Sequence, residues 1–137
     1  MKTTNYFNTF IQVAEDCPIA AAEVPPQKAN ERTVAAIQFE ALYHHPYRYT
    51  SDDVLFQTFA EKKQLAGQEE LAEAREAFFA KGQPCFRSSP LTKRYGWGVH
   101  SNADGKVALY ALESEEYQKL SQDNGLKQVK AMRSKRA

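Results

Sequence analysis

The fold is decided by residues 94–112, which read RYGWGVHSNADGKVALYAL. Two runs rich in aromatic and aliphatic residues flank the segment Asn-Ala-Asp-Gly at 102–105. This pattern is typical of a β-hairpin, because asparagine, aspartate and glycine favour the tight turn between two strands. The sequence therefore predicts antiparallel strands at 94–101 and 106–112.

The length of the loop sets how these strands pair. If all four loop residues lie outside the ladder, Ser101 pairs with Lys106, and Trp97 then opposes Tyr110. One face becomes aromatic and is expected to continue with Phe10 of an N-terminal strand. Such a face suits a ligand platform or a contact between two copies of the chain in a homodimer. The favoured alternative is ordinary packing beneath loops or the following helix, the usual role of aromatic strand residues.

The other face of the hairpin is predicted to be flat and aliphatic. It carries Gly96 and Gly98, and a helix can approach a sheet closely where side chains are absent. An N-terminal strand is predicted at 8–14, where apolar and polar residues alternate with a period of two. The Ile11 side of that strand matches the flat face.

Three helices are predicted between the first strand and the hairpin. The first begins near Asn30 or Thr33, and the second has Thr50 and Ser51 as N-cap candidates, because short polar side chains favour N-cap positions. The third spans about 68–81. Gly82 is expected to end it in a left-handed conformation, as glycine commonly does after a helix.

These elements, with a further short helix capped by Ser114, predict a two-layer α+β domain over 1–125. Its small antiparallel sheet has about three strands, including the hairpin in the C-terminal half. Three to four helices pack on the sheet, mainly on one face. Residues 126–137 form a basic tail, expected to be a frayed helix or disordered, in which lysine and arginine contribute five positive charges and no acid is present.

Composition limits the class of protein. The chain has 137 residues, 42% of them hydrophobic, which is enough material for one folded domain with its own core. No stretch approaches the roughly 20 apolar residues that span a bilayer, and residues 1–13 do not resemble a secretion signal. We therefore expect a cytoplasmic protein without membrane association, in which Cys17 and Cys85 are reduced thiols.

The connector at 83–94 is rich in groups that bind anions. Its cations and hydroxyls could together hold a phosphate or carboxylate. With the hairpin, the candidate binding residues are Arg87, Ser88, Ser89, Lys93, Arg94, Trp97 and Tyr110. The alternative is that the segment is an ordinary connecting loop with solvated charges and no binding role. From these residues we predict a non-catalytic binding module for an anionic small molecule or partner.

The sequence favours no enzyme class, but one catalytic alternative rests on a thiol. Cys85 could act as a nucleophile, with His100 as the partner to test first, although a small buried thiol is the commoner role. Glu40 and His44 stand one helical turn apart, yet they are too few to hold zinc. We predict no metal and no cofactor.

A second alternative is nucleic-acid binding through the basic tail. Lysine and arginine side chains contact phosphates, and the tail carries five of them. It contains no aromatic residue for base stacking, and chain termini tolerate such charge freely. Nucleic-acid binding is therefore not favoured over a solvated terminus.

Three stretches carry a resemblance to a known family: NTFIQVAEDCP at 8–18, SPLTKRYGWGVHS at 89–101 and QVKAMRSKR at 128–136. Together they resemble a family of small bacterial proteins catalogued only as a domain of unknown function. The resemblance spans nearly the whole chain and implies a bacterial, cytosolic, single-domain protein. It implies no activity and no functional residue.

Overall fold

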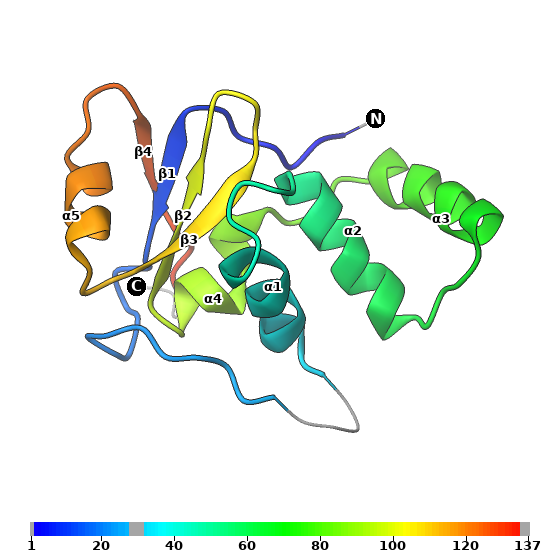
Figure 1. Ribbon diagram of the computed structural model, residues 1–137, viewed down its shortest axis with the longest axis horizontal. Coiled ribbons are helices and arrows are strands. Elements are labelled where there is room, and N and C mark those ends of the chain that lie inside the picture. The colour runs from blue at the N-terminus through cyan, green and yellow to red at the C-terminus, as the bar shows by residue number, and fades with distance from the viewer. Residues whose placement is uncertain (1, 28–31, 135–137) are drawn as a thin grey trace.

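The computed structural model describes residues 2–27 and 32–134, and within them the chain forms an α+β fold around a four-stranded mixed sheet (Figure 1). The sheet order is β3-β2-β1-β4. Helices α1 and α4 cover one face, α5 lies against the other, and α2 leads outward to α3 (Figure 1). The elements are β1 (Thr9–Gln12), α1 (Val34–Tyr43), α2 (Ser51–Lys62), α3 (Gln68–Ala80), the 3-10 turn η1 (Phe86–Ser88), α4 (Pro90–Lys93), β2 (Trp97–Ser101), β3 (Val107–Ala111), α5 (Glu115–Ser121) and β4 (Lys127–Lys130).

The α+β class is confirmed, and the sheet gains a strand from the basic tail. The expectation of a frayed helix or disorder is wrong for Lys127–Lys130, which pair in parallel with β1. The physical reason is the free edge of β1: the amide of Lys127 donates to Asn8 O at 2.9 Å and that of Ala131 to Gln12 O at 2.8 Å. Residues 135 and 136, two of the five tail cations, lie outside the described residues.

The register predicted for the hairpin is wrong by one residue. Ser101 pairs with Val107, because the loop has three residues instead of four. The side-chain oxygen of Asn102 accepts bonds from the amides of Asp104 and Lys106, at 2.9 and 3.0 Å, and its own amide donates to Lys106 O. Gly105 takes the left-handed conformation (φ +79°) that this turn requires.

The shifted register changes which side chains share a face of the hairpin. Because side chains alternate between the two faces, a shift of one residue turns each β3 side chain to the opposite face relative to β2. Trp97 now opposes Ala111, and Tyr110 opposes Gly98. The predicted aromatic face therefore does not form as one surface. Ile11, expected on the glycine side, instead packs on the Trp97 side, and Phe10 contacts Gly98.

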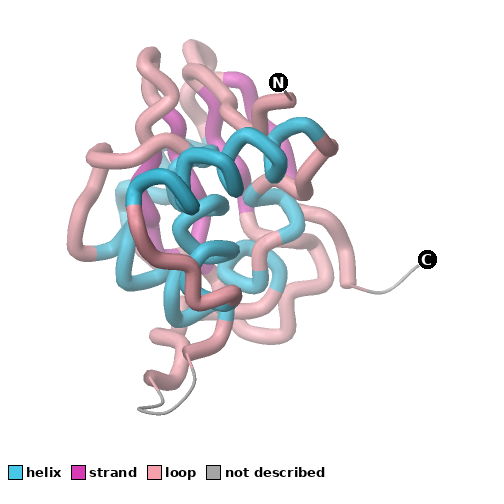
Figure 2. The backbone as a smooth tube through the Cα atoms, turned by 90° about the vertical axis from the view of Figure 1, so that its right-hand side faces the viewer, coloured by secondary structure: helices cyan, strands magenta, loops and turns pink. Residues whose placement is uncertain are grey.

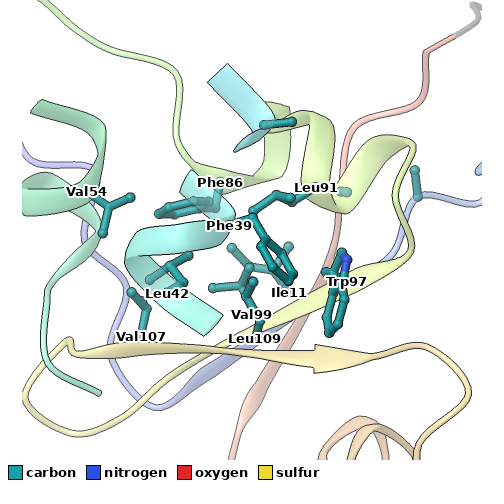
Figure 3. Close-up of a cluster of buried hydrophobic side chains, with 13 residues drawn as sticks. Ile11, Phe39, Leu42, Val54, Phe86, Leu91, Trp97, Val99, Val107 and Leu109 are labelled. Carbon is teal, nitrogen blue, oxygen red and sulfur yellow. The ribbon is translucent and has the colours of Figure 1, made fainter. Parts of the chain in front are cut away.

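Apolar side chains form three clusters. The main core lies between the sheet and α1, α2 and α4, and Figure 3 shows its members Ile11, Phe39, Leu42, Val54, Phe86, Leu91, Trp97, Val99, Val107 and Leu109. A second cluster, around Phe10 and Tyr117, seats α5 on the opposite face. A third joins α2 to α3 through Phe56 and Phe79. Within the described residues, no helix is both long and apolar enough to cross a bilayer.

The helix starts agree with the predicted N-caps, whereas one helix end does not. Thr33, Thr50 and Ser114 each accept a bond from an amide in the first turn that follows them. Gly82 does not adopt the expected left-handed conformation, because Lys81 is already extended. The side chain of Gln83 instead donates to the carbonyl of Phe78 at 2.7 Å, so the end of α3 is satisfied without a glycine turn.

Gly98 provides a test of how closely α5 packs on the sheet. A Cβ at this position would lie 2.6 Å from the ring of Phe10 and 2.7 Å from that of Tyr117. We expect Gly98→Ala to lower the free energy of unfolding by about 1–3 kcal/mol, as overpacking in a core does. Gly82→Ala is the control, since its Cβ would meet only Lys2 Cδ at 3.9 Å. Urea unfolding curves that show equal stabilities for the two variants would contradict this packing.

Candidate functional site

The sequence-predicted site residues are distributed over four separate places. Cys85, Ser88 and Ser89 line a groove between the connector and the helices. Arg87 contacts the end of β4, Lys93 is the last residue of α4 and Arg94 is its C-cap. His100 and Tyr110 lie on the α5 face of the sheet, and Trp97 packs into the main core.

This concavity has mainly apolar walls, and we call it the apolar groove. Its volume is about 360 Å³. Four segments line it: Val34 and Gln38 of α1; Leu55, Thr58, Phe59 and Lys62 of α2; Phe78 of α3; and Gln83, Pro84, Cys85, Ser88, Ser89 and Pro90 of the connector. A volume in this range, with mostly apolar walls and a few polar groups, is typical of small-molecule sites.

Hydrogen bonds hold the connector wall of the groove in place. The buried hydroxyl of Ser89 donates to Gln38 Oε1 at 2.6 Å and accepts from the amide of Leu91 as the N-cap of α4. Thr92 donates its hydroxyl to Phe86 O at 2.6 Å. Ser89, predicted to bind an anion, therefore already uses its hydroxyl to join the connector to α1.

Cys85 brings a thiol to the apolar groove. A hydrogen bond of 3.5 Å joins its sulfur to the hydroxyl of Tyr6. Burial raises the pKa of Tyr6, and the contact with Cys85 adds to this, while Arg87 acts in the opposite direction. Cys85 and Cys17 are both free thiols.

The cations predicted around the connector do not converge on the groove. Arg87 donates through Nε to Lys130 O at 2.7 Å, and Met132 N donates to Arg87 O at 2.8 Å. Arg87 therefore ties the connector to the chain after β4. Lys93 is the last residue of α4 and Arg94 is its exposed C-cap.

Trp97 and Tyr110, paired in the predicted aromatic face, contact different surroundings. Trp97 donates its ring N–H to Glu23 O at 2.8 Å and packs against Phe39, with ring centroids 5.3 Å apart. Tyr110 lies on the other side of the sheet, where its hydroxyl meets that of Tyr47 at 2.7 Å. These two rings cannot contact one ligand at one site.

His100 belongs to a cluster that the sequence analysis missed. The Tyr47 hydroxyl lies 2.7 Å from both His100 Nδ1 and the Tyr110 hydroxyl. Burial lowers the pKa of His100, against the opposing effect of Asp123, and burial raises the pKa of Tyr47. Tyr47 has a left-handed backbone (φ +61°), a local conformation that nothing in its sequence signals.

The remaining groove residues were also missed as site residues. Val34, Phe59, Lys62 and Phe78 come from helices whose apolar residues follow ordinary helical spacing. Nothing in that spacing distinguishes a residue that lines a groove from one that packs in a core. For metal binding, no cluster of three or more histidine, cysteine, aspartate or glutamate side chains is found within 2–27 and 32–134.

Comparison with known proteins bears on the family alone. A family model described as "Family of unknown function (DUF6157)" matches residues 1–137. The match covers the whole chain and confirms the resemblance carried by the three stretches. No curated protein and no solved structure matches the chain.

The lowered pKa of His100 predicts a pH-dependent stability. Its ordinary pKa is 6.5, and burial holds the folded-state value below this. Between the two values the unfolded chain binds more protons, so the free energy of unfolding falls as the pH drops through that window. Urea unfolding at several pH values between about pH 7 and pH 5 measures the free energy of unfolding. We expect this free energy to decrease less steeply with falling pH in His100→Asn than in the unsubstituted protein.

The control for this prediction is His45→Asn, because His45 is exposed. It should retain the slope of the unsubstituted protein. Equal slopes for the unsubstituted protein and His100→Asn would show that His100 contributes nothing to the pH dependence.

Proposed function

The chain belongs to the DUF6157 family of unknown function, and we propose its role from its own site. We infer that it is a non-catalytic binding domain for an anionic small molecule with an apolar body. The body of the ligand lies in the apolar groove. Its anionic group faces the solvent side, near Lys62.

The observation that carries this proposal is the chemistry of the groove walls. Two of the polar residues that line it already have partners within the protein: Gln38 accepts from Ser89, and the Thr58 hydroxyl donates to Val54 O at 2.8 Å. Because these groups are satisfied, they do not require hydrogen bonds from a ligand. What the walls offer is apolar contact with the ligand body.

The charged residues of the groove lining indicate the chemistry of the ligand's polar group. Lys62 is the only charged residue among the described residues that line the apolar groove, and no acidic side chain lines it. Lys62 is the last residue of α2 and is exposed, and its ammonium group donates one hydrogen bond to Arg32 O at 3.2 Å. A positive charge at the solvent side of an apolar groove favours an anion there, and ligands of this kind combine an apolar body with a carboxylate or phosphate.

The same lining favours binding over thiol catalysis. A cysteine nucleophile is usually activated by a nearby base, most often histidine. The described lining of the groove contains no histidine and no carboxylate, and His100 bonds to Tyr47 on the opposite face of the sheet. We therefore propose Cys85 as part of the binding surface.

The basic tail supports nucleic-acid binding less well than the groove supports a small ligand. Lys130 forms an ion pair with Glu15 at 3.0 Å, and its backbone belongs to β4. A phosphate would have to compete with Glu15 for this lysine. No second function is proposed from the tail.

Filling the groove should abolish ligand binding. We expect some members of a panel of apolar carboxylates and phosphates to raise the melting temperature of the protein. At 100 times the dissociation constant the stabilisation is about 2.7 kcal/mol. Val34 lines the groove and is 37% exposed, so Val34→Trp should remove the shift, whereas Val24→Trp, at a position 61% exposed and outside the lining, should retain it. A panel without any stabilising member would refute the proposal.

Ligand should also protect Cys85 from alkylation. Cys85 lines the groove and Cys17 does not. A ligand from the panel at saturation should slow iodoacetamide modification of Cys85 at least several-fold and leave Cys17 unchanged, as peptide mass spectrometry can measure. If both thiols, or neither, were protected, the groove would not be where the ligand binds.

A further inference from the structure

A second groove lies on α3 beside the apolar groove, and we call it the far groove. Its volume is about 480 Å³. Its lining residues are Phe59, Lys63, Leu65, Ala74, Ala77, Phe78, Lys81 and Gln83. Phe59, Phe78 and Gln83 line both grooves, so the two adjoin along these three residues.

Two aromatic rings separate the grooves. The ring centroids of Phe59 and Phe78 are 4.7 Å apart, and both side chains are only partly buried. Partly exposed side chains change rotamer on a fast timescale. A path between the two grooves would require one of these rings to rotate, which is a side-chain motion that leaves the helices folded.

The attachment of α3 also favours such an opening. Of its 13 residues only Phe79 is buried, and the helix lies at the outer end of the molecule, beyond α2 (Figure 1). Seen from that end, helices stand in front of the strands (Figure 2). It is held by the third cluster around Phe56 and Phe79, by the ion pair of Arg75 with Asp53 at 2.9 Å, and by a hydrogen bond of 2.8 Å from Lys2 N to Phe79 O. Elements with few buried contacts move at low cost in free energy.

The charged residues that line the two grooves again favour an anionic ligand. The charged residues that line the two grooves are Lys62, Lys63 and Lys81, and no acid lines either groove within the described residues. A third concavity on the opposite side of α3 differs, because Arg75 and Glu76 both line it. The paired grooves therefore form a surface that is apolar along its floor and positive at its rim.

We propose that the two grooves together bind one long-chain anionic amphiphile, whose unbranched alkyl chain passes between Phe59 and Phe78. This rests on the proposed function and specifies its ligand class. The anionic head lies near Lys62, and the chain ends in the far groove. There the methylene stems of Lys63 and Lys81 can cover it while their ammonium groups stay in water.

The test measures how affinity depends on chain length. Hexanoate, decanoate and tetradecanoate are titrated below their micelle concentrations by isothermal calorimetry. Each methylene that becomes buried should tighten binding about fourfold, so the dissociation constant should continue to fall up to tetradecanoate. Ala77 is exposed and lines the far groove but not the apolar groove. Ala77→Trp should therefore leave hexanoate binding unchanged, and the affinity should no longer increase for the longer carboxylates.

The matched control is Ala72→Trp, which places the same ring at an exposed position on the other side of α3. It should bind all three carboxylates as the unsubstituted protein does. If Ala77→Trp and Ala72→Trp show the same dependence on chain length, the chain does not enter the far groove and this inference is wrong. That outcome leaves the proposed function intact, provided that hexanoate still binds and Val34→Trp abolishes its binding. If no carboxylate binds at any length, this inference is wrong, whereas the proposed function fails only if the wider panel of carboxylates and phosphates also contains no stabilising member.

Discussion

The side chain of Asn102 closes the hairpin, and the arrangement of the sheet depends on that closure. By accepting the amides of Asp104 and Lys106, its oxygen shortens the loop to three residues. The resulting register places Ala111 opposite Trp97 on the α1 face and Tyr110 opposite Gly98 on the α5 face. Because side chains alternate between the faces of a sheet, this closure determines which β3 residues meet the helices on each side.

The same docking of helices onto the sheet creates the apolar groove. Once α1 lies on the main core, its Gln38 is positioned to receive the Ser89 hydroxyl, which anchors the connector opposite α2. The polar groups that the connector carries are then largely bonded within the protein. The wall that faces the groove is mainly apolar, and it includes the Cys85 thiol, which is bonded to Tyr6, and Lys62, whose ammonium group donates to Arg32 O.

The helix α3 differs from the rest of the domain in how it is held. The α1 helix and the strands contribute to a shared core, whereas α3 buries only Phe79 and relies on a cluster of phenylalanine rings with α2. The helix borders both grooves. In the proposed role, α3 would provide ligand access while the sheet and α1 provide the stability of the core.

The sequence by itself determined the features that depend on local interactions. Strand alternation, the N-caps Thr33, Thr50 and Ser114, and the α+β class all follow from neighbours along the chain, and the structure agrees with them. Only the tertiary structure decided the hairpin register, the strand at Lys127–Lys130 and the groove. These depend on the orientation of one amide, on an unpaired edge supplied by a distant strand, and on side chains from four segments. Local sequence patterns do not predict such long-range pairings, because the sequence of each segment is compatible with more than one partner.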